Sequence, residues 1–297
     1  MKLRDLVPEF EKFHIRHKKA SYQQSLNQRM KQTVLPFFGD MEIDKIGRRD
    51  IGDFKQFLVD LELSPKTINE HLSVLSLMFK CAIEREHVDT MPQIKRVPSD
   101  KKFEFKFLEA DEVKRLMAAV DDTLIYAMVK FAVHTGLRIG EIRALEWKHI
   151  DFVHNTVRVC QTTAGDKQVI GSVKGSENRT IPLTADAREA VQGLCRQTNL
   201  VFIPRIIRDG IEVPLGYETC HRGGIVKAAK LANLHQRGFG FHTLRHTYAS
   251  HLARKGVSLF LIQKWLGHVD IRITQRYAHL APDTGHVEAQ VLSGLFS

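Results

Sequence analysis

The stretch FHTLRHTYASHLARKG, residues 241 to 256, predicts a helix in the second half of the chain. Its apolar residues recur at every fourth position, and Gly256 suits the position just after the helix. His242 and Arg245 stand three positions apart and therefore face the same way. Taken alone, His242 is equally consistent with a helix cap or a buried core histidine, and Arg245 with an exposed cation. A metal site at His242 and His246 is a weak alternative, because the glutamate that follows the first histidine in metalloprotease helices is absent.

The stretch HTGLRIGEIRALEW, residues 134 to 147, begins at the end of another predicted helix. This helix follows Asp122 and is densely apolar, and we expect Gly136 to end it. Arg138 comes two residues after the glycine. An arginine in such a turn is, by itself, more often an ordinary surface residue.

A third stretch, LFLIQKWLGHVDIRITQRYAHL, covers residues 259 to 280. Its apolar spacing predicts a helix that Gly267 ends, which would leave His268 exposed at the turn. We expect Asp270 to cap a following helix that carries Tyr277. In isolation, this tyrosine would be a half-buried packing residue.

Together the three stretches resemble the tyrosine site-specific recombinases of the phage integrase type. The order TGLRxxE, HxLRH, LGH and a tyrosine nine residues further on extends this resemblance over residues 108 to 280. Carried over residue by residue, it implies that Glu141 is a supporting carboxylate. It also implies an active site made of Arg138, His242, Arg245, His268 and Tyr277.

The resemblance implies one more catalytic residue, a lysine in a turn between two strands of a small sheet. Lys174, in SVKGSENRTIPL, is the preferred candidate because it stands just before the final predicted strand. Lys167, in the preceding hairpin, is the competing candidate.

The residue types suit attack on a phosphodiester. Arginine is permanently charged and can hold two phosphate oxygens at once. A free tyrosine has a pKa near ~10, so it needs help to lose its proton. The resemblance implies that His242 accepts or steers this proton, that His268 bonds a phosphate oxygen and that Lys174 protonates the departing 5′-oxygen. It further implies a 3′-phosphotyrosyl intermediate formed without metal, ATP or any other cofactor.

The predicted fold is mainly helical. We expect a helical core-type DNA-binding domain at residues 1–90, a linker at 91–106 and a catalytic domain at 107–297. The resemblance implies that the two domains form a clamp around DNA. The β-branched runs at residues 156–162, 168–173 and 179–183 predict a small three-stranded antiparallel sheet.

Four amphipathic helices are predicted in the first hundred residues, at 7–17, 22–34, 51–61 and after Ser64. We expect the second to end before Pro36 and Asp50 to cap the third. Because the first begins almost at Met1, little room is expected for a further N-terminal domain.

Composition favours a cytoplasmic protein with a polyanionic partner. The net charge is +10, and most of the excess lies after residue 100. No apolar run approaches the ~20 residues of a membrane span, and the N-terminus lacks the pattern of a signal peptide. The four cysteines are widely spaced, which is typical of reduced core residues.

The resemblance implies that double-stranded DNA with an inverted-repeat core site is the partner, bound by a homotetramer on two such sites. Accessory proteins are a further partner class that stays open. The apolar tail is expected to dock on a neighbouring protomer through Val291, Leu292, Leu295 and Phe296. Two alternative functions are a type IB topoisomerase and a DNA-binding protein without catalysis. The HxLRH and LGH boxes argue against the first, and the six filled catalytic positions argue against the second.

Overall fold

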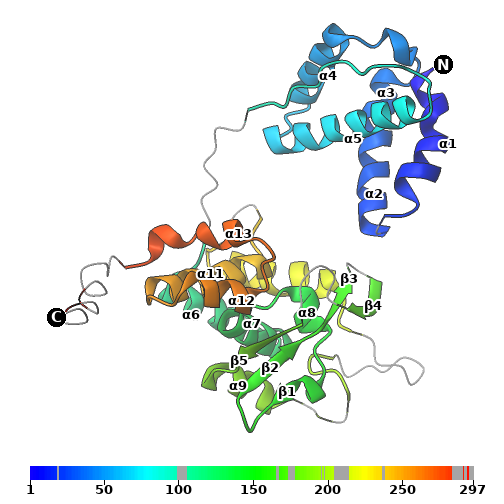
Figure 1. Cartoon of the computed structure of the whole chain (residues 1–297). Helices are drawn as coiled ribbons and strands as arrows, with labels where there is room; N and C mark the ends of the chain where they lie inside the picture. The colour runs from blue at the N-terminus through cyan, green and yellow to red at the C-terminus, as the bar shows by residue number, and fades with distance from the viewer. Residues whose placement is uncertain are drawn as a thin grey trace. The chain divides into compact units, whose positions relative to one another are not determined.

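The computed structural model describes residues 1–18, 20–98, 106–164, 167–172, 178–194, 196, 198–203, 214–235, 238–282, 290 and 293. The chain divides into two compact units, Met1–Phe103 and Glu104–Ser297 (Figure 1). The expected division into residues 1–90, 91–106 and 107–297 stays a prediction, because the boundary between the units falls among residues outside the described ranges.

The first unit is a bundle of helices around an apolar core, which includes the fully buried Phe10, Phe38, Phe54 and Phe79. Short 3-10 segments at Leu3–Leu6 and Ile43–Lys45 and π-helical segments at Glu11–Ile15 and Met30–Val34 adjoin its helices. These helices are α1 (Val7–Phe10), α2 (Ala20–Arg29), α3 (Leu35–Phe38), α4 (Arg48–Asp60) and α5 (Pro65–Glu84).

The helix expected to end before Pro36 instead continues to Phe38. A proline inside a regular α-helix lacks one N–H donor and clashes with the carbonyl four residues earlier. Here the π-helical segment comes just before it, and the Leu35 N–H donates to Met30, five residues back. This wider turn changes the register ahead of Pro36, so the chain stays helical.

The expected cap of α4 is also wrong, and a cap of α5 that was not predicted is present. Gly47 is the N-cap of α4, and the Asp50 carboxylate accepts the Gly47 N–H at 2.8 Å from the third helical position. The Ser64 hydroxyl accepts the Thr67 N–H at the start of α5. Acidic residues suit both the cap and the first turn, so the sequence alone did not separate these two positions.

Part of the predicted linker packs on the first unit. Asn69 of α5 donates to the Val97 carbonyl at 2.9 Å and accepts the Val97 N–H at 2.8 Å. Ile94 and Val97 lie against the apolar core of this unit. The chain is therefore fastened along α5 up to this point.

The second unit is helical with a small sheet at one edge (Figure 1). Its helices are α6 (Ala110–Ala118), α7 (Thr123–Thr135), α8 (Ile139–Arg143), α9 (Ala185–Gln192), α10 (Lys227–Leu231), α11 (Phe241–Arg254), α12 (Leu259–Leu266) and α13 (Ile271–Gln275), with a π-helical segment at Thr219–Val226 and 3-10 segments at Trp147–His149 and Ala278–Leu280. Its strands are β1 (Ile150–Asp151), β2 (Thr156–Val159), β3 (Gln161–Ala164), β4 (Lys167–Ser172) and β5 (Arg179–Pro182).

A three-stranded antiparallel sheet is present, in the order β1-β2-β5. Val157 of β2 pairs with Ile150 on one side and Ile181 on the other. The prediction of a small antiparallel sheet in a mainly helical chain is thus confirmed. The strand expected at residues 168–173 is not part of this sheet. Residues 168–172 lie in β4, which pairs with β3 in a separate hairpin. Strand β2 is central, and both of its edges are already taken by β1 and β5.

Asp122 caps α7, and the predicted glycine ends of two helices in this unit are confirmed. The Asp122 carboxylate accepts the Ile125 N–H at 2.8 Å at the start of α7. Gly136 and Gly267 end α7 and α12 with φ of 65° and 66°. Only glycine adopts this left-handed conformation readily. Within the described ranges, no helix combines the length and apolar character needed to cross a bilayer.

Candidate active site

Arg245 joins three helices of the second unit. It lies on α11 and is 3% exposed. Its guanidinium donates to the Gly136 carbonyl at 2.8 Å and to the Leu266 carbonyl, at the C-terminal ends of α7 and α12. Carbonyls at helix ends lack partners within the helix and carry partial negative charge, so they suit a buried cation. The burial and the charge of Arg138 lower the pKa of Arg245 to about 9, which leaves it charged at neutral pH.

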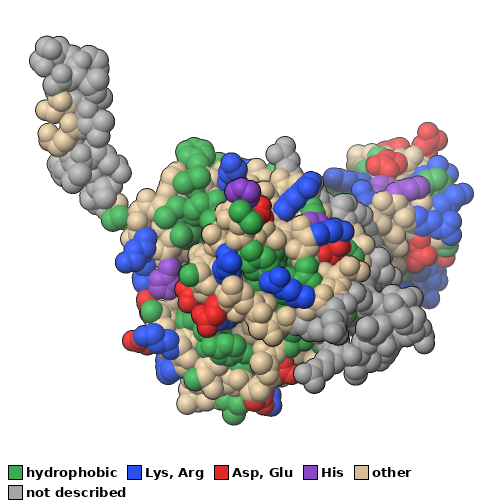
Figure 2. Space-filling view, turned by 90° about the horizontal axis from the view of Figure 1, so that it is seen from below, with side chains coloured by type: hydrophobic (Ala, Val, Ile, Leu, Met, Phe, Trp, Pro, Cys, Tyr) green, Lys and Arg blue, Asp and Glu red, His purple; other side chains and the backbone are tan. Residues whose placement is uncertain are grey.

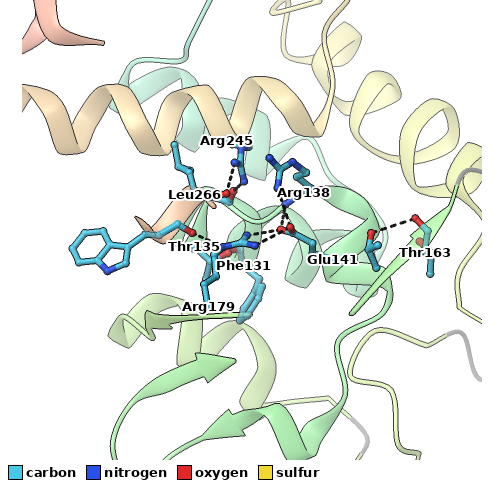
Figure 3. A network of polar contacts seen from close by, with 11 residues as sticks. Phe131, Thr135, Arg138, Glu141, Thr163, Arg179, Arg245 and Leu266 are labelled. Atoms are coloured by element: carbon cyan, nitrogen blue, oxygen red, sulfur yellow. Dashed lines mark hydrogen bonds and ion pairs between the residues drawn. The ribbon is translucent and has the colours of Figure 1, made fainter. Parts of the chain in front are cut away.

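Arg138 is held by the carboxylate of Glu141, three residues further on. It is the N-cap of α8, and its backbone N–H donates to Glu141 Oε2 at 2.9 Å. Its side chain donates to Oε1 at 3.1 Å. Glu141 in turn meets Arg179 of β5, so the carboxylate lies between two arginines (Figure 3). Although burial acts to raise its pKa, the bonds from Arg179 and Arg138 hold the pKa of Glu141 below the usual range.

His268 follows Gly267 at the end of α12 and is half-buried rather than exposed, which corrects the prediction. Its Nδ1 lies 2.9 Å from the hydroxyl of Thr274, a buried residue of α13. The packing of α13 against α12 covers the imidazole, and sequence periodicity did not reveal this contact. Burial, followed by the charges of Arg245 and Arg138, lowers the pKa of His268 to about 3.

Tyr277 lies just after α13 rather than on it, because this helix ends at Gln275. The prediction that the helix carries the tyrosine is therefore wrong by two residues. The side chain is 2% exposed, and its hydroxyl lies 2.6 Å from Nδ1 of His246. Burial raises the pKa of Tyr277 to about 12, so the phenol keeps its proton at neutral pH.

His246 is a residue of the site that sequence reasoning missed, since it was weighed only as a metal ligand. Burial, together with His242 and Arg245, lowers its pKa to about 4. A neutral imidazole has one acceptor nitrogen, which can take the hydrogen bond of the phenol. The signal was its place one turn after His242, because residues four apart share a helix face.

His242 lies at the start of α11, on the exposed part of the site. Its ring centroid is 5.9 Å from that of His246. Burial and the charges of Arg245 and Arg138 lower its pKa. The histidine expected to take the phenolic proton is thus one turn away from the one that contacts the phenol here.

Arg179 is the second residue that was missed. It opens the strand RTIP, in which Arg179 and Ile181 are buried and the residues between and after them are exposed. This period-two alternation places the arginine on the core face of β5, and that alternation was the available signal.

Of the two lysine candidates, Lys174 lies outside the described residues, and Lys167 is the first residue of β4. The β3–β4 hairpin packs on α8, where the Thr163 hydroxyl donates to the Gly140 carbonyl at 3.4 Å. A side chain at Gly140 would come within 2.7 Å of the Thr162 hydroxyl. Glycine therefore lets the hairpin approach the helix that begins beside Arg138.

The structure thus brings five of the six predicted catalytic residues into one electrostatic environment. Arg138 and Arg245 both lower the pKa values of His242 and His268, and Arg245 acts on Tyr277. Within the described ranges, no three His, Cys, Asp or Glu side chains are grouped as metal ligands. Two cations and neutral imidazoles around a phenol form a site that can bind a tetrahedral oxyanion and present an oxygen nucleophile to it.

The sequence profile described as the Phage integrase family matches residues 106–284. Tyrosine recombinase XerD of Oceanobacillus iheyensis is 29% identical over 80% of this chain and 79% of its own length. The integrase of Salmonella phage P22 is 30% identical over 76% of this chain and 57% of its own length.

Solved structures with the same fold include the Tn1549 transposon integrase in complex with a circular intermediate DNA, with a TM-score of 0.79 and 22% identity over 99% of this chain and 100% of that chain. A second is a lambda integrase tetramer bound to a Holliday junction, with a TM-score of 0.72 and 21% identity over 91% of this chain and 78% of that chain. At these identities the likeness shows the fold.

Proposed function

This chain belongs to the phage integrase family of tyrosine recombinases, and from that premise we propose that it recombines DNA at specific sites with Tyr277 as its nucleophile. The observation that carries the assignment is the contact between the Tyr277 hydroxyl and His246, beside the buried cation of Arg245. A phenol that bonds a neutral imidazole next to a cationic anion site has both a proton acceptor and a place for its target.

The proposed reaction is attack of the Tyr277 Oη on phosphorus. The bond from phosphorus to the 5′-oxygen breaks, and a 3′-phosphotyrosyl bond forms in its place. The phenolic proton leaves through His246, its hydrogen-bond partner, and Lys174 protonates the departing 5′-oxygen. A 5′-hydroxyl from a partner strand then reverses the step. Because the energy of the phosphodiester is kept in the phosphotyrosyl link, the rejoining requires no ATP.

Arg138 and Arg245 neutralise the charge that grows on the non-bridging oxygens in the transition state. Arg138 is 36% exposed, so DNA can reach its guanidinium, whereas Arg245 is held by two carbonyls. His242 and His268 are neutral and can each donate one hydrogen bond to the phosphate. Donors that are fixed before the reaction stabilise developing charge most effectively.

We further propose that the two units close around double-stranded DNA at an inverted-repeat core site. The net charge of +10 supports a polyanionic partner. In Figure 2, the Lys and Arg side chains of the second unit are interspersed with other side chains rather than gathered in one block, so the net charge carries this part of the argument. A homotetramer on two sites, as for the lambda integrase bound to a Holliday junction, is the proposed active assembly. Accessory proteins stay an open partner class.

The test uses Tyr277→Phe and a DNA fragment that carries the recombination site. The substitution removes only the phenolic oxygen, and the buried ring keeps its packing against the core of the site. We expect site binding within about twofold of wild type and no protein–DNA adduct that resists denaturation. A covalent adduct formed by the Phe variant would show that another residue is the nucleophile.

A second measurement separates strand exchange from simple resealing. Two duplexes of different length, each with one site, are incubated with the wild-type protein. We expect products that join strands of both duplexes. Relaxation of supercoiled DNA without any joined product would instead assign the topoisomerase reaction to this site.

A further inference from the structure

A buried arginine, Arg179, connects parts of the active site that lie far apart in sequence. It donates from Nη1 and Nη2 to the two oxygens of Glu141, at 3.0 and 2.7 Å. It also donates from Nε to the Trp265 carbonyl at 2.7 Å. Resting on the proposed function, we propose that Arg179 is a positioning residue that fixes Arg138 and the His268 turn in the geometry needed for cleavage.

Arg179 is buried and its charge is paired with the Glu141 carboxylate, which separates it from the phosphate, whereas the equally buried Arg245 donates to two neutral carbonyls and keeps its net charge. The side chain of Arg179 is 4% exposed and that of Glu141 is 1% exposed, whereas that of Arg138 is 36% exposed. All three guanidinium nitrogens of Arg179 are engaged by Glu141 and Trp265. The guanidinium therefore acts on the reaction only through the groups that it holds.

The first of these groups is the carboxylate of Glu141. Each of its two oxygens accepts one bond from Arg179 and one from Arg138. Arg138 thus gives a single side-chain bond to this carboxylate, because its own backbone N–H and the two bonds from Arg179 fill the other positions. Without Arg179, the buried carboxylate would draw Arg138 into a bidentate pair and away from the phosphate, since a buried charge without a partner is costly.

The second group is the turn that carries His268. The Trp265 carbonyl is bound by Arg179, and the next carbonyl, that of Leu266, is bound by Arg245. Gly267 packs directly on the Arg179 guanidinium, since a Cβ there would come within 2.9 Å of Nη1. Two arginines thus hold consecutive carbonyls ahead of His268.

The test measures single-turnover cleavage by Arg179→Lys. Lysine keeps the charge but cannot bond both carboxylate oxygens and the Trp265 carbonyl together. Misplacement of a catalytic group by about 1 Å can slow a reaction roughly 100-fold, so we expect a loss of about this size with site affinity within about twofold.

A substrate with a methylphosphonate at the cleaved position identifies the route of this effect. Replacing one charged oxygen by methyl makes the diester neutral, so less cationic stabilisation is needed. If Arg179 acts by placing Arg138, the loss of cleavage rate of Arg179→Lys relative to wild type should shrink to less than about 10-fold on this substrate. The loss of Arg138→Ala should shrink in the same way. Equal losses on both substrates would mean a merely structural role and overturn the proposal.

Arg188→Lys is the matched control. Arg188 also bonds a carbonyl and a side-chain oxygen, those of Phe152 and Asn155, at 2.6 and 2.7 Å, but among the described residues it has no bond to the site. We expect it to cleave both substrates at wild-type rates. If Arg179→Lys does not fold, the double variant Arg179→Gln with Glu141→Gln removes both buried charges and is measured instead. We expect its loss of cleavage rate to be larger on the normal substrate than on the methylphosphonate substrate.

The outcomes separate this proposal from the proposed function. Wild-type cleavage by Arg138→Ala would refute the assigned active site itself. Slow cleavage by Arg138→Ala together with wild-type cleavage by Arg179→Lys would leave the site intact and refute only the positioning role.

Discussion

At the scale of single residues, the site is arranged so that its cations are arginines and its histidines are neutral. The pKa values of His246 and His268 are lowered to about 4 and about 3, because both imidazoles are half-buried beside cations. Neutral imidazoles donate or accept hydrogen bonds but add no charge at neutral pH. The arginines, together with the proposed lysine, must then neutralise the phosphate.

The general acid is the residue-scale assignment that cleavage kinetics can test most directly. Lys174→Ala should slow cleavage by roughly 100 to 10,000-fold, because the 5′-oxygen must otherwise leave as an alkoxide. A substrate with sulfur at the bridging 5′-position needs no proton, since a thiol is far more acidic, so its cleavage should recover. Single-turnover rates on both substrates measure this.

Lys167→Ala is the matched control, because Lys167 lies at the start of β4 in the neighbouring hairpin. It should cleave the oxygen substrate at near wild-type rates. If sulfur rescues Lys167→Ala and not Lys174→Ala, the acid is Lys167.

At the scale of elements, the glycine turn that ends α7 places Arg245. Gly136 ends α7 with φ of 65°, and its carbonyl accepts a bond from Arg245. A Cβ at this position would lie 2.4 Å from Tyr248 Cδ1 on α11 and 2.9 Å from Leu266 Cδ2 on α12. The absence of a side chain therefore sets how closely α7, α11 and α12 approach one another.

Gly136→Ala should lower the free energy of unfolding by roughly 2 to 4 kcal/mol, from the left-handed backbone and the overlap with Tyr248. Cleavage should also fall, because the carbonyl that holds Arg245 moves. Gly52→Ala is the control, since Gly52 lies inside α4 with no atom near its Cβ position. It should raise the free energy of unfolding by about 0.5–1 kcal/mol. Equal changes in the free energy of unfolding for Gly136→Ala and Gly52→Ala, measured by chemical denaturation, would contradict the packing argument.

At the scale of the whole molecule, two half-buried histidines make the second unit sensitive to acid. The pKa values of His246 and His268 are lower in the folded protein than the ~6.5 of an unfolded chain. The unfolded state therefore binds more protons below this pH, so their stabilising contribution is complete above ~6.5 and is lost as pH falls toward about 4 and 3.

We expect the melting temperature to fall as pH decreases from 7 to 5, and His268→Asn to show a shallower fall. Differential scanning calorimetry across this range measures both slopes. Identical slopes for the variant and the wild type would show that His268 titrates normally in the folded protein.

Assembly is also a property of the whole molecule. Removal of the residues after Pro282 should leave binding to a single site within about threefold of wild type but reduce the tetramer on two sites, because the apolar tail would no longer dock on a neighbour. Sedimentation of the protein with two-site DNA measures this. An unchanged tetramer would mean that the tail packs on its own protomer.

The sequence by itself determined the features that depend on neighbours along the chain. The glycine ends of α7 and α12 involve groups within four residues of one another, so local patterns predicted them. The family motifs indicated the function from sequence for the same reason, because each motif is a short run of neighbouring residues. The assignment of the six catalytic residues stays a prediction that the variants above test.

Tertiary structure alone decided which groups meet across the site. His246 and Tyr277 are 31 residues apart, and Glu141 and Arg179 are 38 apart. Local propensity does not couple residues at such separations; they meet because helices and strands pack their apolar faces together. The same packing covers His268 with α13 and places β4 in its own hairpin. The partners of each catalytic group therefore follow from the packed core rather than from the motifs that contain them.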